Sequence, residues 1–281
     1  MSEQSPTVVL HLESRPQTLT IVRGILGGLA EVLAIDPELL DDLKTAVSEA
    51  CNNVVLHAYG GAPGPMRVRV FVEPERLRVT VEDDGVGLPP GGRGLDEASG
   101  IGVSVIRALT EDARFAPGSD GGTVVEMDFA GHRDGKTLYQ VPGSPDGAAP
   151  EQPIAPLQPG EVVVTLSPVN LFAPVLGRLA RTLAATAHFS LDRFSDVYLV
   201  TDTIAAHANG ATAGPRIGAR VMASERRLEL VVGPFRRGTG AVLQASGAAR
   251  PSPLALLSDE VSVQRDGETE LVHVVVIDHR R

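Results

Sequence analysis

The 281-residue sequence has one cysteine and no tryptophan, and it lacks a long uninterrupted apolar segment. A single cysteine excludes an internal disulfide framework and any metal site built from several cysteines. The most apolar stretch, residues 21–35, is interrupted by Arg23, Glu31 and three glycines, and so it is too short and too polar to cross a bilayer. The first residues have neither the basic segment nor the apolar core of a signal peptide. We therefore expect a cytoplasmic protein with no membrane partner.

Positive charge is also scarce, because 25 lysines and arginines face 35 acidic residues and leave a net charge of −10. A protein that binds nucleic acid directly, or an anionic membrane, needs a basic face. Neither function is expected here. Hydrophobic residues make up 43% of the chain, which argues against global disorder. The length is ample for two domains.

Proline marks the division of the chain. Six prolines fall within residues 132–160, together with many glycines and alanines and without helical or strand periodicity. This composition is typical of an extended, semi-rigid linker. It predicts one domain over residues 1–131 and a second over residues 161–281.

The first half shows an ordered series of helix and strand patterns. Asp36 and Pro37 are a typical helix start, because aspartate caps free N–H groups and proline suits the first turn. The patterns predict an α+β fold, a two-layer sandwich with helices on one face of a mostly antiparallel sheet. In chain order we expect a strand, two helices, two strands, a glycine-rich loop, a helix and a strand at residues 7–13, 19–33, 38–58, 66–72, 76–81, 85–100, 103–109 and 123–129.

The second half repeats this order at a distance of about 150 residues. Residues 57–60 (HAYG) align with residues 207–210 (HANG), and the Arg-Leu pair at Arg76 aligns with that at Arg227. We interpret the repeat as a tandem duplication. Chance similarity between two α+β units is the alternative. The expected elements are strands 162–166, 216–223, 227–232 and 271–277, and helices 174–187 and 191–207.

Three local patterns carry candidate chemistry. Glu49, Asn53 and His57 are spaced four apart on one predicted helix, so they share a face beside its apolar stripe. Asp83 ends a strand, where its carboxylate can accept a hydrogen bond from the exocyclic amine of adenine. Gly100-Ile101-Gly102 opens a helix whose free N–H groups can hold phosphate. A solvated helix face and an ordinary acidic turn are the simpler alternatives for the first two.

The three patterns together resemble a known family. Residues 46–59 resemble the N-box of bacterial anti-sigma-factor serine/threonine kinases, and residues 83–87 their first glycine box. Residues 100–102 resemble the second glycine box, and Gly122-Thr123 the final one. The resemblance covers residues 6–130 and implies the histidine-kinase-like ATPase fold, shared with gyrase and histidine kinases.

The resemblance also implies ATP and Mg²⁺ as cofactors and a role for each residue. Glu49 would be the general base that acts on a serine hydroxyl. Asn53 would present its amide oxygen to Mg²⁺, and Asp83 would read adenine with support from Thr123. The residues that would let the nucleotide approach closely and would hold its phosphates are Gly85, Gly87, Gly100, Ile101 and Gly102.

The implied function is that of an anti-sigma factor with serine/threonine kinase activity toward an anti-anti-sigma antagonist. The implied partners are a sigma factor and that antagonist, and the chain would form a homodimer or an intramolecular pseudo-dimer. The alternative is a non-catalytic ATP-binding switch that sequesters a protein partner. Glu49 distinguishes the two, because a protein that only binds nucleotide needs no base at this position.

The second half lacks these site residues. In the alignment Leu199 stands for Glu49, Thr203 for Asn53 and Pro234 for Asp83, and the second glycine box has no counterpart. We expect residues 161–281 to be a degenerate ATPase-like copy kept for protein contacts. An unrelated recognition domain for a protein partner is the alternative.

Overall fold

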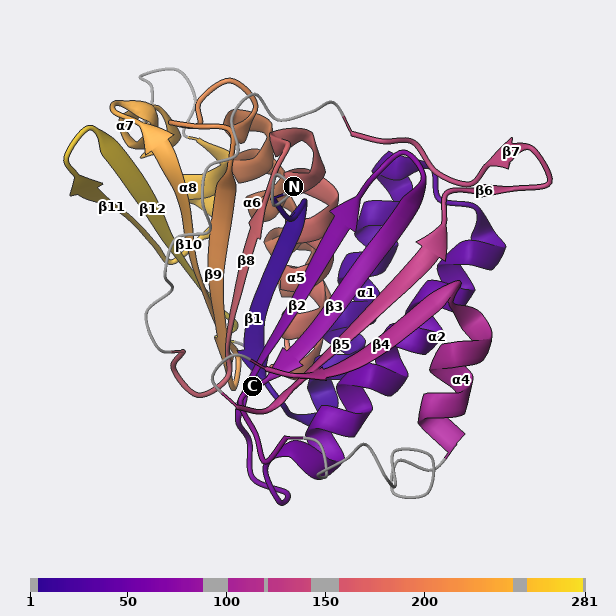
Figure 1. Ribbon diagram of the computed structural model, residues 1–281. Coiled ribbons are helices and arrows are strands. Elements are labelled where there is room, and N and C mark those ends of the chain that lie inside the picture. Colours follow the sequence, from indigo (N-terminus) through magenta and orange to yellow (C-terminus); the bar gives the residue numbers. More distant parts are fainter. Residues whose placement is uncertain (1–4, 88–100, 119–120, 143–156, 245–251, 280–281) are drawn as a thin grey trace. The chain divides into compact units, whose positions relative to one another are not determined.

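The computed structural model describes residues 5–87, 101–118, 121–142, 157–244 and 252–279. The chain divides into two units, residues 1–143 and 144–281, and each is described by itself. Figure 1 shows the elements of both units. Among the described residues, no helix combines the length and the apolar character that crossing a membrane requires.

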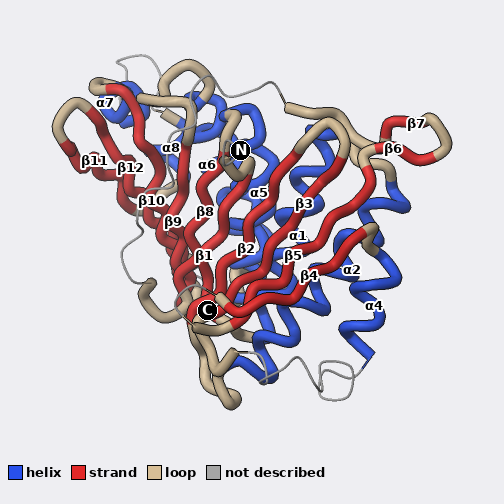
Figure 2. The backbone as a smooth tube through the Cα atoms, viewed as in Figure 1, coloured by secondary structure: helices blue, strands red, loops and turns tan. Residues whose placement is uncertain are grey.

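The first unit contains an antiparallel sheet in the order β1-β2-β3-β5-β4. Its helices cover one face of this sheet, as Figures 1 and 2 show. The α+β class and the antiparallel sheet expected from the sequence are therefore confirmed for this unit. Its elements are β1 (Val8–Glu13), α1 (Pro16–Leu33), α2 (Pro37–Asn53), the π-helical turn η1 (Val54–Ala58), β2 (Pro65–Val72), β3 (Arg76–Asp83), α4 (Ile101–Leu109), β4 (Asp112–Pro117), β5 (Thr123–Ala130), β6 (His132–Arg133) and β7 (Lys136–Thr137).

Alternation along the central strands produces the two faces of the sheet. Val68 on β2 and Leu77 on β3 are buried, while their sequence neighbours are only partly buried. Because side chains alternate along a strand, the odd-numbered residues of β2 and the even-numbered residues of β3 form the other face. That face carries ion pairs, among them Arg69 to Glu82 at 2.6 Å. One face is thus apolar and faces the helices, and the other is charged.

Helix α2 starts as its sequence indicates. The Asp36 side chain accepts a hydrogen bond from the Glu38 amide at 3.1 Å, and Pro37 occupies the first turn. The helix expected over residues 38–58 is present, but its last turn, η1, is a π-helix and not an α-helix. Cys51 is buried in this helix, and burial raises the pKa of its thiol to about 12. The cysteine is therefore a core residue.

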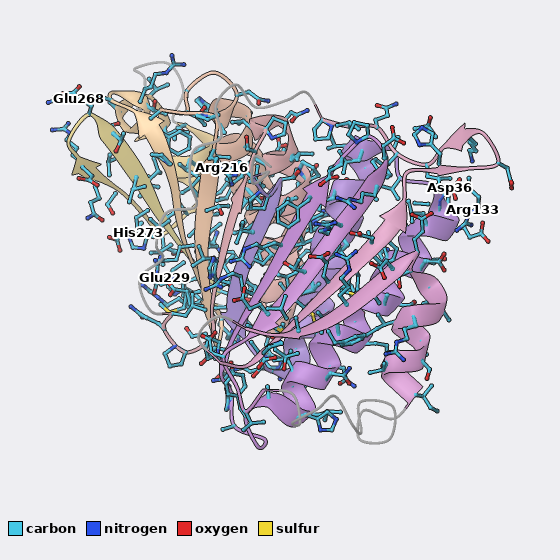
Figure 3. All side chains as sticks on the ribbon, viewed as in Figure 1. Asp36, Arg133, Arg216, Glu229, Glu268 and His273 are labelled. Atoms are coloured by element: carbon cyan, nitrogen blue, oxygen red, sulfur yellow. The ribbon has the colours of Figure 1, made fainter. Side chains whose placement is uncertain are left out.

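Residues 132–142 belong to the first unit, although the sequence predicts a linker there. The chain turns through β6 and β7 and then buries Leu138 and Tyr139. The Leu138 carbonyl accepts a hydrogen bond from the Asp36 amide at 2.7 Å, and Lys136 pairs with the Asp36 carboxylate at 2.6 Å. Figure 3 labels Asp36 close to Arg133, which belongs to this hairpin. The rest of the expected linker, up to residue 156, lies outside the described residues.

Strand β4 is absent from the sequence-based expectation. It lies at the edge of the sheet beside β5, and its residues are exposed or half-buried, with none fully buried. An edge strand of this kind needs no apolar alternation, which is the pattern by which strands are recognised in a sequence. It pairs with β5, the next strand along the chain, as a hairpin in which Pro117 stands opposite Thr123.

The second unit has a sheet in the order β8-β9-β10-β12-β11, with α5 and α6 in the positions that α1 and α2 hold along the chain of the first unit. Numbered within each unit, both sheets therefore have the order 1-2-3-5-4. The sequence analysis missed α7, α8 and β11. The elements are β8 (Glu161–Leu166), a 3-10 turn (Val169–Leu171), α5 (Phe172–Thr186), α6 (Leu191–Ala208), β9 (Ile217–Ser224), β10 (Arg227–Arg236), α7 (Thr239–Gln244), α8 (Pro253–Leu257), β11 (Glu260–Asp266) and β12 (Thr269–Ile277).

Candidate functional site

The first part of the candidate site lies where α4 approaches α2. A β-carbon added to Gly102 would lie 2.8 Å from Glu49 Oε2 and 3.5 Å from Asn53 Oδ1. The glycine therefore brings the backbone of α4 against the two polar side chains, which are both half-buried. His57, the third residue of the predicted face, is exposed in the π-helical turn. Two of the three residues on that face thus lie against the second glycine box.

The second part of the site is the end of β3. Asp83 is 4% exposed, and its Oδ1 accepts a hydrogen bond from the Gly85 amide at 2.9 Å. Burial raises the pKa of this carboxyl, and hydrogen bonds from the backbones of Gly85 and Thr123 oppose that rise. Thr123 stands directly opposite Asp83 in the register of β3 and β5. The structure therefore places the two residues assigned to adenine side by side.

The glycines beside Asp83 allow close contacts between backbone segments. A β-carbon on Gly85 would lie 2.2 Å from the Ala58 carbonyl oxygen, and one on Gly122 would lie 1.9 Å from the Asp83 carbonyl oxygen. Gly87 has a φ of +73° and lies against Gly122. Because real β-carbons do not approach atoms so closely, any side chain at position 85 or 122 would displace the turn. These glycines fix the turn through packing, whatever else they permit.

Tyr59 belongs to the same corner, and the sequence reasoning missed it as a site residue. Its hydroxyl accepts a hydrogen bond from the Asp84 amide at 2.8 Å and donates one to the Pro65 carbonyl at 2.6 Å. The only signal in the sequence is its position at the end of the run 46–59, directly before two glycines. That position gives no indication of a contact with residue 84.

The structure says less about the remaining predicted residues. Gly100 lies outside the described residues, as do residues 88–99 between the two glycine boxes. Ile101 opens α4 and is 81% exposed. Within the described ranges, no group of three or more histidine, cysteine or acidic side chains could hold a metal ion. A magnesium ion here would be held by the Asn53 oxygen together with phosphate oxygens, a donor set that suits this cation.

The matching region of the second unit is built from different groups. Leu199, which aligns with Glu49, is an exposed apolar residue, and Phe235, next to the aligned Pro234, is fully buried. At the start of β12 the buried Glu270 carboxylate accepts a hydrogen bond from the Gly240 amide at 3.0 Å. The aligned positions therefore offer neither a base nor an acidic reader at the end of β10.

The structure thus brings a buried aspartate at the end of a strand beside a helix that carries a glutamate and an asparagine, which is the arrangement that the sequence predicts for a nucleotide site. Residues 12–129 match the family model of the histidine kinase-like ATPase domain. The anti-sigma F factor of Pasteuria penetrans is 38% identical over 111 residues, which cover 35% of this chain and 74% of that protein. The chain belongs to this family of histidine kinase-like ATPases, in the branch that includes anti-sigma factors.

Two further relatives carry the name serine-protein kinase RsbW. That of Bacillus licheniformis is 30% identical over 141 residues, which cover 45% of this chain and 87% of that protein. That of Bacillus pumilus is 38% identical over 88 residues, which cover 30% of this chain and 54% of that protein. The last match thus spans about half of the relative's length.

Proposed function

We propose that this protein is an ATP-dependent anti-sigma factor that acts in the cytoplasm and phosphorylates a serine of an anti-anti-sigma antagonist. The observation that carries the proposal is the contact of Gly102 with both Glu49 and Asn53. It puts a carboxylate and an amide oxygen at the helix start that would hold phosphate. The names of the relatives, an anti-sigma factor and serine-protein kinases, support the same function.

The residues of the site divide the work between binding and proton transfer. Asp83 would accept a hydrogen bond from the exocyclic amine of adenine, with Thr123 beside it. Glu49 would accept the proton of the serine hydroxyl while the serine oxygen bonds to the terminal phosphorus and ADP leaves. Magnesium, held by Asn53, would neutralise phosphate charge. Positioning and charge neutralisation provide most of the rate in phosphoryl transfer.

A nucleotide-dependent switch that transfers no phosphate is the second candidate, because it needs Asp83 and the glycines but not Glu49. The test is transfer of label from radiolabelled ATP to the cognate antagonist protein. Wild type is compared with Glu49→Ala and with Asp41→Asn as a matched control. Asp41 lies exposed on the same helix, two turns before Glu49.

Loss of a general base typically lowers a rate by a factor of roughly 10²–10⁴. We expect Glu49→Ala to reduce labelling by about that factor and to retain ADP binding, while Asp41→Asn labels normally. Labelling that is insensitive to Glu49→Ala would remove this residue as the base. Normal ADP binding by a wild-type protein that transfers no label would favour the switch.

In this proposal the second unit is a degenerate duplicate of the first. It provides protein contacts that a second protomer would otherwise make. The shared strand order and the shared order of helices support the duplication. Leu199 and Pro234 replace the base and the adenine reader. A calorimetric titration of the full chain should give one MgADP per chain. Two equivalent MgADP sites per chain would contradict the proposal that the second unit binds no nucleotide.

A further inference from the structure

Three successive backbone amides after Asp83 are each held by a different acceptor. The Asp84 amide donates to the Tyr59 hydroxyl at 2.8 Å, and the Gly85 amide donates to Asp83 Oδ1 at 2.9 Å. The Val86 amide donates to the Ala58 carbonyl at 3.0 Å. Two of these acceptors come from the end of the helix that carries Glu49 and Asn53. The turn that contains the adenine reader is therefore attached to the catalytic helix through residues 58 and 59.

The Tyr59 ring is itself fixed in place. It lies over Gly64 so closely that a β-carbon there would be 2.4 Å from the ring. Gly64 is held by Ser14, the residue after β1. The Ser14 amide donates a hydrogen bond to the Gly64 carbonyl at 2.8 Å, and the Ser14 hydroxyl accepts one from the Gly64 amide at 3.0 Å. On its other side the Tyr59 hydroxyl donates to the Pro65 carbonyl at 2.6 Å. The hydroxyl thus has a defined position that requires no ligand.

We propose that Tyr59 is a positioning residue of the nucleotide site, whose hydroxyl holds the turn at Asp84 so that the Asp83 carboxylate is set to select adenine. This inference rests on the proposed function, because it assumes that Asp83 reads the base. Without the hydroxyl the Asp84 amide loses its partner, and the turn retains two of its three attachments. The aligned residue of the second unit is Asn209, which has no phenol.

The charge state of Tyr59 is compatible with this role. Burial raises its pKa to about 12, and the charges of Asp83 and Asp84 contribute in the same direction. The phenol therefore remains protonated at neutral pH and keeps its donor for the Pro65 carbonyl.

The test is Tyr59→Phe, which removes the hydroxyl and keeps the ring over Gly64. Its matched control is Tyr139→Phe in the same unit, because the Tyr139 hydroxyl also donates to a backbone carbonyl, that of Glu73, at 2.5 Å. Both variants lose one hydrogen bond to a carbonyl, so a general loss of stability should affect them similarly. The readouts are the dissociation constants of MgADP and MgGDP by calorimetry, and the kcat of phosphotransfer at saturating ATP.

A net hydrogen bond contributes about 0.5–1.5 kcal/mol, and 1.4 kcal/mol corresponds to tenfold in affinity. We expect Tyr59→Phe to weaken MgADP binding about three- to tenfold, to reduce the preference for MgADP over MgGDP, and to leave kcat within about twofold. Tyr139→Phe should bind both nucleotides as wild type does. Equal nucleotide affinities in the two variants would overturn the inference.

Failure of the proposed function would give a different result, because wild type itself would then transfer no label to the antagonist or would not bind MgADP. If Tyr59→Phe does not fold, Gly64→Ala provides the second variant, since its β-carbon displaces the ring while the hydroxyl is retained. Gly64→Ala should show the same loss of MgADP affinity and of base preference. Wild-type affinity in Gly64→Ala would also overturn the inference.

Discussion

Replacing Gly102 by alanine should separate the stability of the protein from its proposed phosphotransfer activity. Gly102 lies in the first turn of α4, where glycine is a poor helix former. Alanine stabilises a helix by up to about 1 kcal/mol relative to glycine, with less at a helix end. The free energy of unfolding should therefore stay constant or rise in Gly102→Ala.

The new methyl group would act on the side chain of Glu49, the proposed general base. It would lie 2.8 Å from Glu49 Oε2, whereas ordinary van der Waals contact begins at 3.4 Å. The carboxylate ends a flexible side chain, and so it can move away without displacing either helix. The distances from the new methyl group to the Asn53 side chain, 3.5 Å and 3.7 Å, are those of ordinary van der Waals contact. The substitution should therefore displace Glu49 selectively.

A misplacement of about 1 Å can cost a factor of roughly 10² in rate. The smaller shift needed here should reduce phosphotransfer to the antagonist by about ten- to a hundredfold, as measured by transfer of label from ATP. The matched control is Gly177→Ala on α5, where the nearest atom to a new β-carbon is Arg181 Nη2 at 3.9 Å. That control should gain similar stability and keep full activity.

Wild-type phosphotransfer by Gly102→Ala would refute the reasoning, because it would show that Glu49 need not occupy its position against α4. A Gly102→Ala protein that melts well below wild type would also refute it, since the clash would then have displaced the helix. Thermal unfolding and label transfer should be measured on the same preparations.

Two further predictions concern the carboxylates of β3. Asp83→Asn should weaken MgADP binding by about ten- to a hundredfold, because a hydrogen bond to a charged group contributes about 1.5–3 kcal/mol; unchanged binding in calorimetry would exclude Asp83 as the adenine reader. Burial alone would raise the pKa of Glu82, but the hydrogen bond from Arg69 and the charges of Arg67 and Arg69 outweigh it, and the pKa is lowered. Ionised Glu82 therefore stabilises the fold above its unfolded pKa, and this stability is lost as the pH falls through its folded pKa. At pH 7, Glu82→Gln should lower the free energy of unfolding, measured by urea denaturation, by about 1–2 kcal/mol. The difference in this free energy between wild type and variant should shrink in acid. A difference that does not change with pH would contradict the stabilising role of ionised Glu82.

Patterns within single elements could be predicted because they depend on neighbours in the chain. The four-residue spacing of Glu49 and Asn53 places them on one helix face in any context. The position of Asp83 at the end of an alternating strand is equally local. The start of α2 follows from Asp36 and Pro37. The sequence therefore determined the class of fold, the order of most elements and the residue types of the site.

An exposed strand and the patterns that depend on distant residues could not be predicted. Strand β4 is exposed at a sheet edge, so it carries no apolar alternation. The segment that contains Leu138 has a linker-like composition, and only its contact with the start of α2 shows that it belongs to the first unit. The bond between Tyr59 and the turn after Asp83 joins residues 25 positions apart.

The sequence by itself determined which residues are candidates for binding a nucleotide and transferring its phosphate. The tertiary structure decided how they meet: Gly102 approaches Glu49 from a different helix, and Thr123 pairs with Asp83 from a different strand. The physical reason is that helix and strand periodicity depends on local backbone geometry, whereas these contacts depend on how the sheet and the helices pack together. Packing is set by the whole core, and no short segment contains that information.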